Sequence, residues 1–181
     1  RRRGASVHTS LLVHGTWAAN EQWWKPGGNF HSYLLNGIRP DLYANADAFS
    51  WSGIYSEAAR AIAATELQGW LAGHTIQNPY LLTHSHGGSV AMLATQNGLN
   101  TGPLVLLSCP VHSIYMPDFA RTGRVVSIRV KLDLVILADG GGQKFSDPRI
   151  TERVLPIWFD HSATHEPAVW QRYNLRSVIP P

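Results

Sequence analysis

The chain has 181 residues, of which 44% are hydrophobic and 15% charged, and its formal net charge is +3. This length fits one domain with a sizeable core, so we expect residues 1–181 to form a single domain. No apolar run approaches the ~20 residues that cross a bilayer, so we expect no membrane span. The chain has one basic run, at its start, and we expect no nucleic-acid partner. The single cysteine, Cys109, excludes an internal disulfide.

The N-terminal residues do not have the pattern of a secretory signal. Three arginines at positions 1–3 precede a short apolar run at 7–13, which His8 interrupts. This run is too short and too polar for the hydrophobic part of a signal peptide. We therefore expect a cytoplasmic location, with secretion left open, and the sequence indicates no oligomeric state.

Short apolar runs alternate along the chain with longer segments of helical periodicity. The predicted strands are 7–13, 46–51, 79–83, 103–108, 124–132 and 153–159. The predicted helices are 29–38, 56–72, 87–97 and one that begins near Pro167. Strands that alternate with helices and are almost wholly apolar predict an α/β fold. We expect a three-layer α/β/α sandwich with a mostly parallel sheet of about six strands.

Polar side chains directly follow four of the predicted strands: His14, Ser85, Asp133 and His161. The carboxyl ends of parallel strands meet at one edge of a sheet, and this edge is where open α/β sheets bind ligands. The sequence therefore predicts a functional site that combines these residues.

Ser85 lies between an apolar strand and a predicted helix, in the segment THSHGG at positions 83–88. A strand that turns directly into a helix can hold such a serine on a strained turn, the nucleophile elbow, usually written Gly-x-Ser-x-Gly. Thr83 replaces the first glycine, whereas Gly87 and Gly88 allow close approach and leave backbone N–H groups free. A serine before a helix also serves as an N-cap, but the flanking strand and paired glycines favour a nucleophile.

The segment 84–88 (HSHGG) and the upstream segment 14–16 (HGT) resemble the α/β-hydrolase superfamily, particularly its lipases and esterases. The resemblance runs from about residue 11 to residue 170 and implies a minimal α/β-hydrolase fold without a large lid. It also implies an oxyanion hole built from the backbone N–H groups of Thr16 and His86. His14 is expected to hold the oxyanion loop by hydrogen bonds and, with Trp17, to border the substrate pocket.

A nucleophilic serine needs a base, and the base needs a carboxylate that fixes its orientation. In the superfamily these groups follow the serine in the order acid, then histidine. Asp133 follows an apolar strand and precedes an aliphatic pair, as the superfamily's acid does, whereas Asp139 lies beside three glycines and is typical of a turn. His161 follows the last predicted strand and is the expected base, with His165 as the alternative.

Other interpretations stay open. The histidine pairs 84/86 and 161/165 suggest a metal site, but the second pair needs a helix where the sequence is typical of a loop, so we expect no metal and no cofactor. A non-catalytic binding protein on the same fold is an alternative, as is thioesterase, amidase or lyase chemistry with the same residues. The favoured function is hydrolysis of a small-molecule or lipid carboxylic ester through Ser85, Asp133 and His161.

Overall fold

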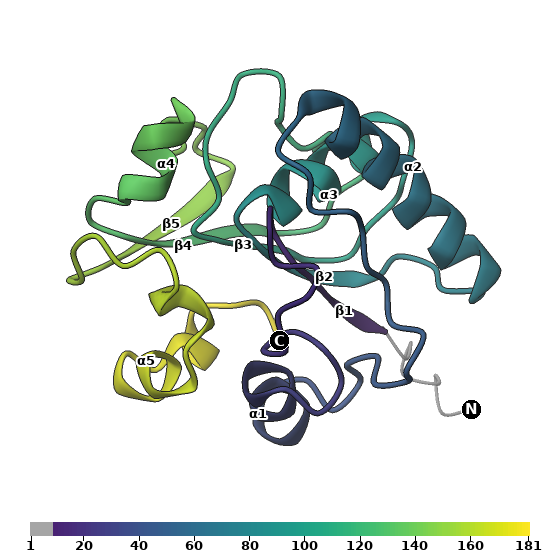
Figure 1. Cartoon of the computed structure of the whole chain (residues 1–181), viewed down its shortest axis with the longest axis horizontal. Helices are drawn as coiled ribbons and strands as arrows, with labels where there is room; N and C mark the ends of the chain where they lie inside the picture. The colour runs from purple at the N-terminus through teal and green to yellow at the C-terminus, as the bar shows by residue number, and fades with distance from the viewer. Residues whose placement is uncertain (1–8) are drawn as a thin grey trace.

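The computed structural model describes residues 9–181, which form a central sheet with helices on both faces (Figure 1). The arginine-rich start and the first two residues of the predicted strand 7–13 lie outside the described residues. Within the described part, no helix is long and apolar enough to cross a membrane.

The sheet contains five parallel strands, and their order across the sheet is their order along the chain. The strands are β1 (Ser10–Val13), β2 (Tyr80–His84), β3 (Leu104–Leu107), β4 (Val125–Val130) and β5 (Ile150–Leu155). Val13 pairs with Thr83, and His84 pairs with Leu107, so neighbouring strands end at one edge. Strands β1 to β4 are buried at every position, which is why their sequences are nearly continuous apolar runs.

Helices cover both faces of this sheet, as Figure 1 shows. The helices are α1 (Asn29–Gly37), α2 (Glu57–Gly73), α3 (His86–Gln96), α4 (Leu134–Asp139) and α5 (Pro167–Arg172), with 3₁₀ turns at Ala163–His165 and Leu175–Ser177. One apolar cluster joins α2 and α3 to the sheet, and a second joins α1 and α5 to its other face. Alternate residues of each strand enter the two clusters, which confirms the predicted three layers.

The longest helix, α2, forms where the sequence predicts it. The hydroxyl of Ser56 accepts a hydrogen bond from the backbone N–H of Ala59 at 3.0 Å, which satisfies one of the unpaired donors of the first turn. Ala63, Leu67 and Leu71 repeat at helical spacing and are buried.

Two strand predictions need correction. The segment 46–51 is buried at Phe49 and Trp51 but forms no strand, so the sheet has five strands rather than six. Trp51 is held by His14 instead of by a strand neighbour: its backbone N–H donates to His14 Nε2 at 3.2 Å, and its indole N–H donates to the His14 carbonyl at 2.8 Å. The predicted strand 153–159 is displaced, because Pro156 lacks the N–H that would continue β5.

Two features near the sheet edge bear on the site. Helix α4 was not predicted; Asp133 caps its start and Gly140 ends it in a left-handed conformation. The connection between β3 and β4, residues 108–124, contains no helix, in keeping with the expected absence of a large lid.

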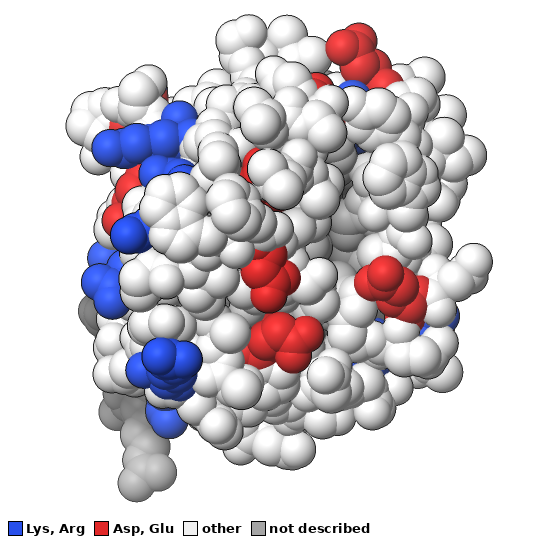
Figure 2. Space-filling model, turned by 60° about the vertical axis from the view of Figure 1, so that its left-hand side comes forward, with Lys and Arg blue, Asp and Glu red and all other residues white. Residues whose placement is uncertain are grey.

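The charged side chains are unevenly spread over the face that Figure 2 shows. Most of the visible Lys and Arg lie toward one margin of this face, most of the visible Asp and Glu lie nearer its middle and its other side, and much of the visible surface is uncharged.

Two glycines at the start of α3 allow the helix to approach the sheet. A Cβ on Gly87 would lie 2.6 Å from the carbonyl oxygens of Val13 and His14. A Cβ on Gly88 would lie 2.6 Å from the sulfur of Cys109. Both distances are shorter than packed atoms allow. A side chain at Gly87 would clash with backbone, and one at Gly88 would displace the side chains of Cys109 and Leu106.

Gly87→Ala is expected to lower the free energy of unfolding by about 1–3 kcal/mol, because the added carbon overpacks the contact with β1. Gly69→Ala, within α2, is the matched control: its added carbon meets nothing within 4 Å. Since alanine favours helix over glycine, the control is expected to gain about 0.5–1 kcal/mol. Urea unfolding of both variants tests this, and a Gly87→Ala protein as stable as the native chain would contradict the close packing.

Candidate active site

Ser85 occupies the turn between β2 and α3 in a strained conformation. Its φ is 53° and its ψ is −133°. Residues other than glycine rarely adopt this backbone conformation, which costs about 1–3 kcal/mol. The backbone N–H of Ser85 donates to the Leu107 carbonyl at 2.8 Å, and α3 begins at the next residue. The sheet and the helix therefore fix the turn from both sides, and the serine side chain lies at the edge where the strands end.

Thr83, which stands where the usual elbow has glycine, is fully buried. Its hydroxyl donates to the Val105 carbonyl of the neighbouring strand at 2.9 Å, so the polar group is satisfied inside the core. Close approach around the turn depends on glycine elsewhere: a Cβ on Gly15 would lie 2.8 Å from both the His84 carbonyl and the Ser85 Cβ.

Asp133 is buried at the end of β4, and its two carboxylate oxygens have separate partners. Oδ1 accepts from the backbone N–H groups of Val135 and Ile136 at 3.0 and 3.1 Å, which caps α4. Oδ2 accepts from Nδ1 of His161 at 2.6 Å. The Gln143 side chain bonds both the N–H and the carbonyl of Asp133, at 2.8 and 2.9 Å. The carboxylate is therefore rigidly oriented toward His161.

His161 lies on the loop that follows β5 and lines the same cavity as Ser85. Among the described residues, no hydrogen bond joins these two side chains directly. The backbone carbonyl of His161 accepts from Nε2 of His84 at 3.1 Å, so the residue before Ser85 also supports the histidine loop. Burial lowers the pKa of His84 well below its ordinary value, which keeps this support neutral.

The backbone N–H groups of Thr16 and His86 have no hydrogen-bond partner among residues 9–181. His86 is the first residue of α3, where N–H groups have no acceptor within the helix. The side chains of the two residues are joined, since Thr16 Oγ1 lies 2.9 Å from His86 Nδ1. Both residues line the cavity beside Ser85, so the two amides are available to a ligand.

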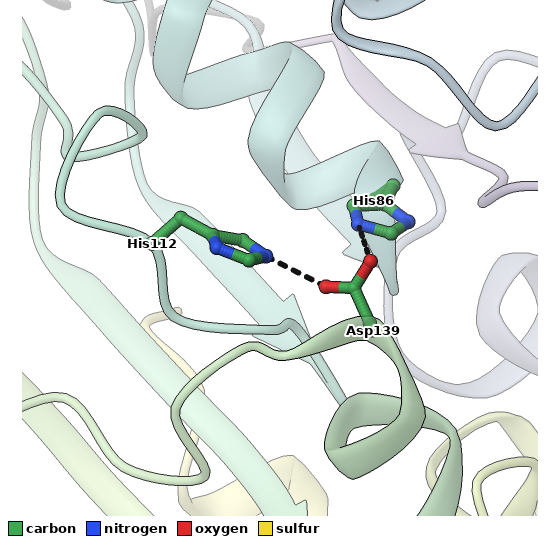
Figure 3. A group of neighbouring side chains, drawn as sticks. All are labelled: His86, His112 and Asp139. Carbon is green, nitrogen blue, oxygen red and sulfur yellow. Dashed lines mark hydrogen bonds and ion pairs between the residues drawn. The ribbon is translucent and has the colours of Figure 1, made fainter.

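A second histidine–aspartate group lies beside the first. Figure 3 shows the rings of His86, from α3, and His112, from the loop after β3, both directed at Asp139 at the end of α4. His112 Nε2 lies 2.6 Å from Asp139 Oδ2, and His86 Nε2 lies 3.2 Å from Oδ1. The hydroxyl of Tyr55 also donates to Oδ1, at 2.6 Å. Asp139 is therefore part of the cavity wall and a residue of α4, not the turn residue that its three glycines suggested.

The pKa values around this second group keep a charged carboxylate beside a neutral ring. Burial lowers the pKa of His86 to about 4. Burial would raise the pKa of Asp139, but hydrogen bonds from Tyr55 and His112 hold it below its ordinary value. Sequence reasoning missed this group because its members are far apart in the chain.

Two other predicted site residues lie away from the cavity. His14 is fully buried and packs on Trp24 and Trp51, with ring centroids 4.5 and 5.7 Å away, so the expectation that it borders the pocket is wrong. Its ring contacts the carbonyl of Gly15 at 2.9 Å and the hydroxyl of Ser50 at 3.1 Å, and so joins the segment before Thr16 to the segment before Trp51.

His165, the alternative base, is stacked on Trp23 with a centroid distance of 4.0 Å and an interplanar angle of 6°. Burial lowers the pKa of His165 to about 4. Asp133, the predicted acid, bonds His161 and not His165. His165 is thus a packed, neutral ring beneath the loop that carries His161.

The cavity has a volume of about 450 Å³, and its polar lining residues are Thr16, Ser85, His86, Asp139 and His161. Apolar and aromatic side chains form most of the remaining wall: Trp17, Tyr55, Leu134, Val135 and Ala138. Trp17 is 74% exposed and so stands at the rim rather than in the core. The arrangement can hold a small, largely apolar molecule with a polar centre at the serine.

The fold and this edge define an open, parallel α/β sheet with a serine on a strained strand-to-helix turn. A family model described as the alpha/beta hydrolase family matches residues 11–178, and the chain belongs to that family.

Solved structures of alpha/beta hydrolases resemble parts of the chain. One is an extracellular alpha/beta-hydrolase from a Paenibacillus species, described as sharing structural and functional homology with tobacco salicylic acid binding protein 2. It is 18% identical, with a TM-score of 0.40, over 58% of this chain and 42% of that one. Another, an alpha/beta hydrolase fold protein from Burkholderia ambifaria, is 15% identical, with a TM-score of 0.40, over 59% and 38%. The matched part thus spans less than half of the length of each of these two solved proteins. No curated protein matches the chain.

The buried, neutral His165 is expected to make stability depend on pH. Its pKa is about 4 in the folded chain and 6.5 ordinarily, so between these values the unfolded chain binds more protons. The free energy of unfolding should therefore fall as the pH is lowered from 6.5 to 4, with this residue contributing on the order of 3 kcal/mol.

His165→Phe keeps an aromatic ring beside Trp23 and removes the titration, so its unfolding free energy should fall less steeply over the same pH range. His74→Gln is the control: His74 is paired with Asp47, which raises its pKa, and its loss should not make the slope shallower. Equal slopes for the native chain and His165→Phe would show that the buried ring is not responsible.

Proposed function

We propose that this alpha/beta hydrolase cleaves carboxylic esters, with Ser85 as nucleophile, His161 as general base and Asp133 as the acid that orients it. The observation that carries the proposal is that Ser85, on its strained turn at the sheet edge, and His161 line one cavity. Nδ1 of His161 lies 2.6 Å from the buried carboxylate of Asp133. A serine hydroxyl is a weak nucleophile unless a base takes its proton, and these residues supply that combination.

In the proposed mechanism, Nε2 of His161 accepts the Ser85 proton while Oγ attacks the ester carbonyl carbon. Asp133 holds the Nδ1–H of His161 and stabilises the imidazolium that forms. The negative oxygen of the tetrahedral intermediate accepts hydrogen bonds from the N–H groups of Thr16 and His86. His161 then protonates the leaving alcohol. In the second half, a water molecule gives a proton to His161 and attacks the acyl carbon. The bond to Ser85 Oγ then breaks, His161 returns the proton to Oγ, and the carboxylic acid is released.

The wall of the cavity supports an apolar acyl or aryl group as the substrate's main recognition element. Leu134, Val135 and Ala138 come from α4, directly after Asp133, and Trp17 follows Thr16. The residues that would surround the substrate's apolar group are therefore close in sequence to the proposed catalytic residues. A volume of about 450 Å³ suits a substrate of modest size.

A fluorophosphonate probe is expected to add once to the native chain and not at all to Ser85→Ala, because the probe reacts only with an activated serine. Intact-mass spectrometry measures the adduct. His161→Ala should slow labelling and lower kcat for a p-nitrophenyl ester by about 10⁴-fold or more, as loss of the base does in triad enzymes.

His165→Phe is the matched control for His161, because it changes a neighbouring histidine outside the cavity. It is expected to label at nearly the native rate. The assignment of the base would be wrong if His165→Phe, and not His161→Ala, lost the adduct. A folded native chain that never labels would overturn the proposed nucleophile.

Ala138→Phe is expected to narrow the cavity and shift selectivity toward short esters. Its kcat/KM should fall about tenfold for hexanoate esters and less than about twofold for acetate, because steric exclusion acts on the longer acyl chain. Leu137→Phe, on the same helix but outside the cavity lining, is the control and should leave the ratio unchanged. A chain-length series of p-nitrophenyl esters tests both, and an unchanged ratio in Ala138→Phe would place the acyl group elsewhere.

A further inference from the structure

The side chains of the second histidine–aspartate group are not used by the proposed hydrolysis, which takes only the backbone N–H of His86, although His86 and Asp139 line the same cavity. His86 Nε2, His112 Nε2 and a carboxylate oxygen of Asp139 all lie within 4.8 Å of one another. Figure 3 shows both rings directed at the same carboxylate, from three separate parts of the chain. Two imidazoles and one carboxylate, with further positions left for other ligands, form a donor set used by protein zinc sites.

The surroundings of the Nε2 atom of His86 indicate a ligand. It is buried and has no hydrogen-bond partner among the described residues, although an oxygen of Asp139 lies 3.2 Å away. The imidazole side chain is only 5% exposed, so water does not readily satisfy this atom. A buried polar atom that faces a carboxylate without an aligned hydrogen bond needs another partner.

The other nitrogen of His86 is already held. Thr16 Oγ1 lies 2.9 Å from Nδ1 and can accept its proton; in the tautomer that carries the proton there, the lone pair of Nε2 is directed at Asp139. Two electron pairs that face each other in this way repel, and a cation between them removes the repulsion. Orientation of a ligating imidazole through its second nitrogen is typical of metal sites.

We propose that His86, His112 and Asp139 bind a divalent transition-metal ion, and that Zn²⁺ is the ion they suit best. Imidazole and carboxylate ligands fit Zn²⁺, whereas Mg²⁺ and Ca²⁺ prefer oxygen ligands alone. The neutral His86 and the charged Asp139 are in the protonation states that metal binding needs.

The geometry defines what must move. A tetrahedral ion about 2.0–2.1 Å from each ligand separates the ligand atoms by roughly 3.3 Å. The 3.2 Å between His86 and Asp139 already fits. The direct hydrogen bond of 2.6 Å between His112 and Asp139 must open, and His112 must carry its proton on Nδ1 instead. His112 is on a loop and is half-buried, so this adjustment does not disturb the sheet. No metal was expected from the sequence because the histidine pairs 84/86 and 161/165 are local, whereas these three ligands come from separate parts of the chain.

Burial is the main cause that lowers the pKa of His86, and the charge of the buried Arg60 lowers it further. Its guanidinium lies over the rings of Tyr55 and Tyr115, at 5.8 and 5.3 Å, and donates to the Tyr115 hydroxyl at 3.0 Å. This positive charge weakens cation binding, so we expect micromolar affinity rather than the tighter binding of structural zinc sites.

Zinc binding by the untagged, metal-stripped chain tests the proposal through competition with a chromophoric chelator. The native chain is expected to bind one equivalent of Zn²⁺, and Co²⁺ in its place should give the visible absorption of a nitrogen–oxygen site. His112→Gln and Asp139→Asn should each weaken binding at least about tenfold. His74→Gln changes a half-buried histidine that is paired with Asp47 away from this group, and should bind as the native chain does.

A native chain that takes up no metal, or His112→Gln and Asp139→Asn variants that bind like it, would overturn the proposal. Equal loss in His74→Gln would attribute the metal to the surface instead. Thermal unfolding with and without Zn²⁺ guards against misfolded variants, because an ion that binds only the folded chain raises Tm. These measurements do not involve Ser85, so their outcome is separate from that of the labelling experiment.

Discussion

The reversal of the chain at Ser85 is the constraint around which the rest of the site is arranged. One residue joins a fully buried strand to a buried helix, with φ at 53° and ψ at −133°. Such a turn persists only where its surroundings hold it. Here β3 bonds its backbone, and Gly15 and Gly87 let β1 come within contact of it. The strained turn, the placement of the glycines and the position of the serine hydroxyl therefore depend on one another.

Helix α4, only six residues long, connects the two histidine–aspartate groups. Asp133 caps its first turn with one oxygen and holds His161 with the other. Asp139, its last residue, holds His112 and faces His86. Three of the apolar residues between them, Leu134, Val135 and Ala138, line the cavity. A shift of this helix would thus act at once on the proposed base, on the cavity wall and on the proposed metal site.

Much of this arrangement could be predicted, because it depends on neighbours in sequence. The run before Ser85 and the glycines after it indicated the turn, and Ser56 marked the start of α2. The rest depends on distant contacts. The segment 46–51 has the composition of a strand, but His14 occupies the place of a strand partner for Trp51. His112 and Asp139 are 27 residues apart, and no local pattern pairs them. The position of His161 after the last predicted strand favoured it over His165, and burial and the bond to Asp133 distinguish the two rings.

The packing of Cys109 against Gly88 gives the molecule a built-in chemical reporter. This only cysteine is buried at the end of β3, and burial raises the pKa of its thiol to about 12. A protonated, enclosed thiol does not react with alkylating reagents until the surrounding structure opens. Because the sulfur contacts the first turn of α3, its rate of alkylation under native conditions measures how often the helix behind Ser85 separates from the sheet. The frequency of local opening at the site can thus be measured through the native cysteine, without an introduced label.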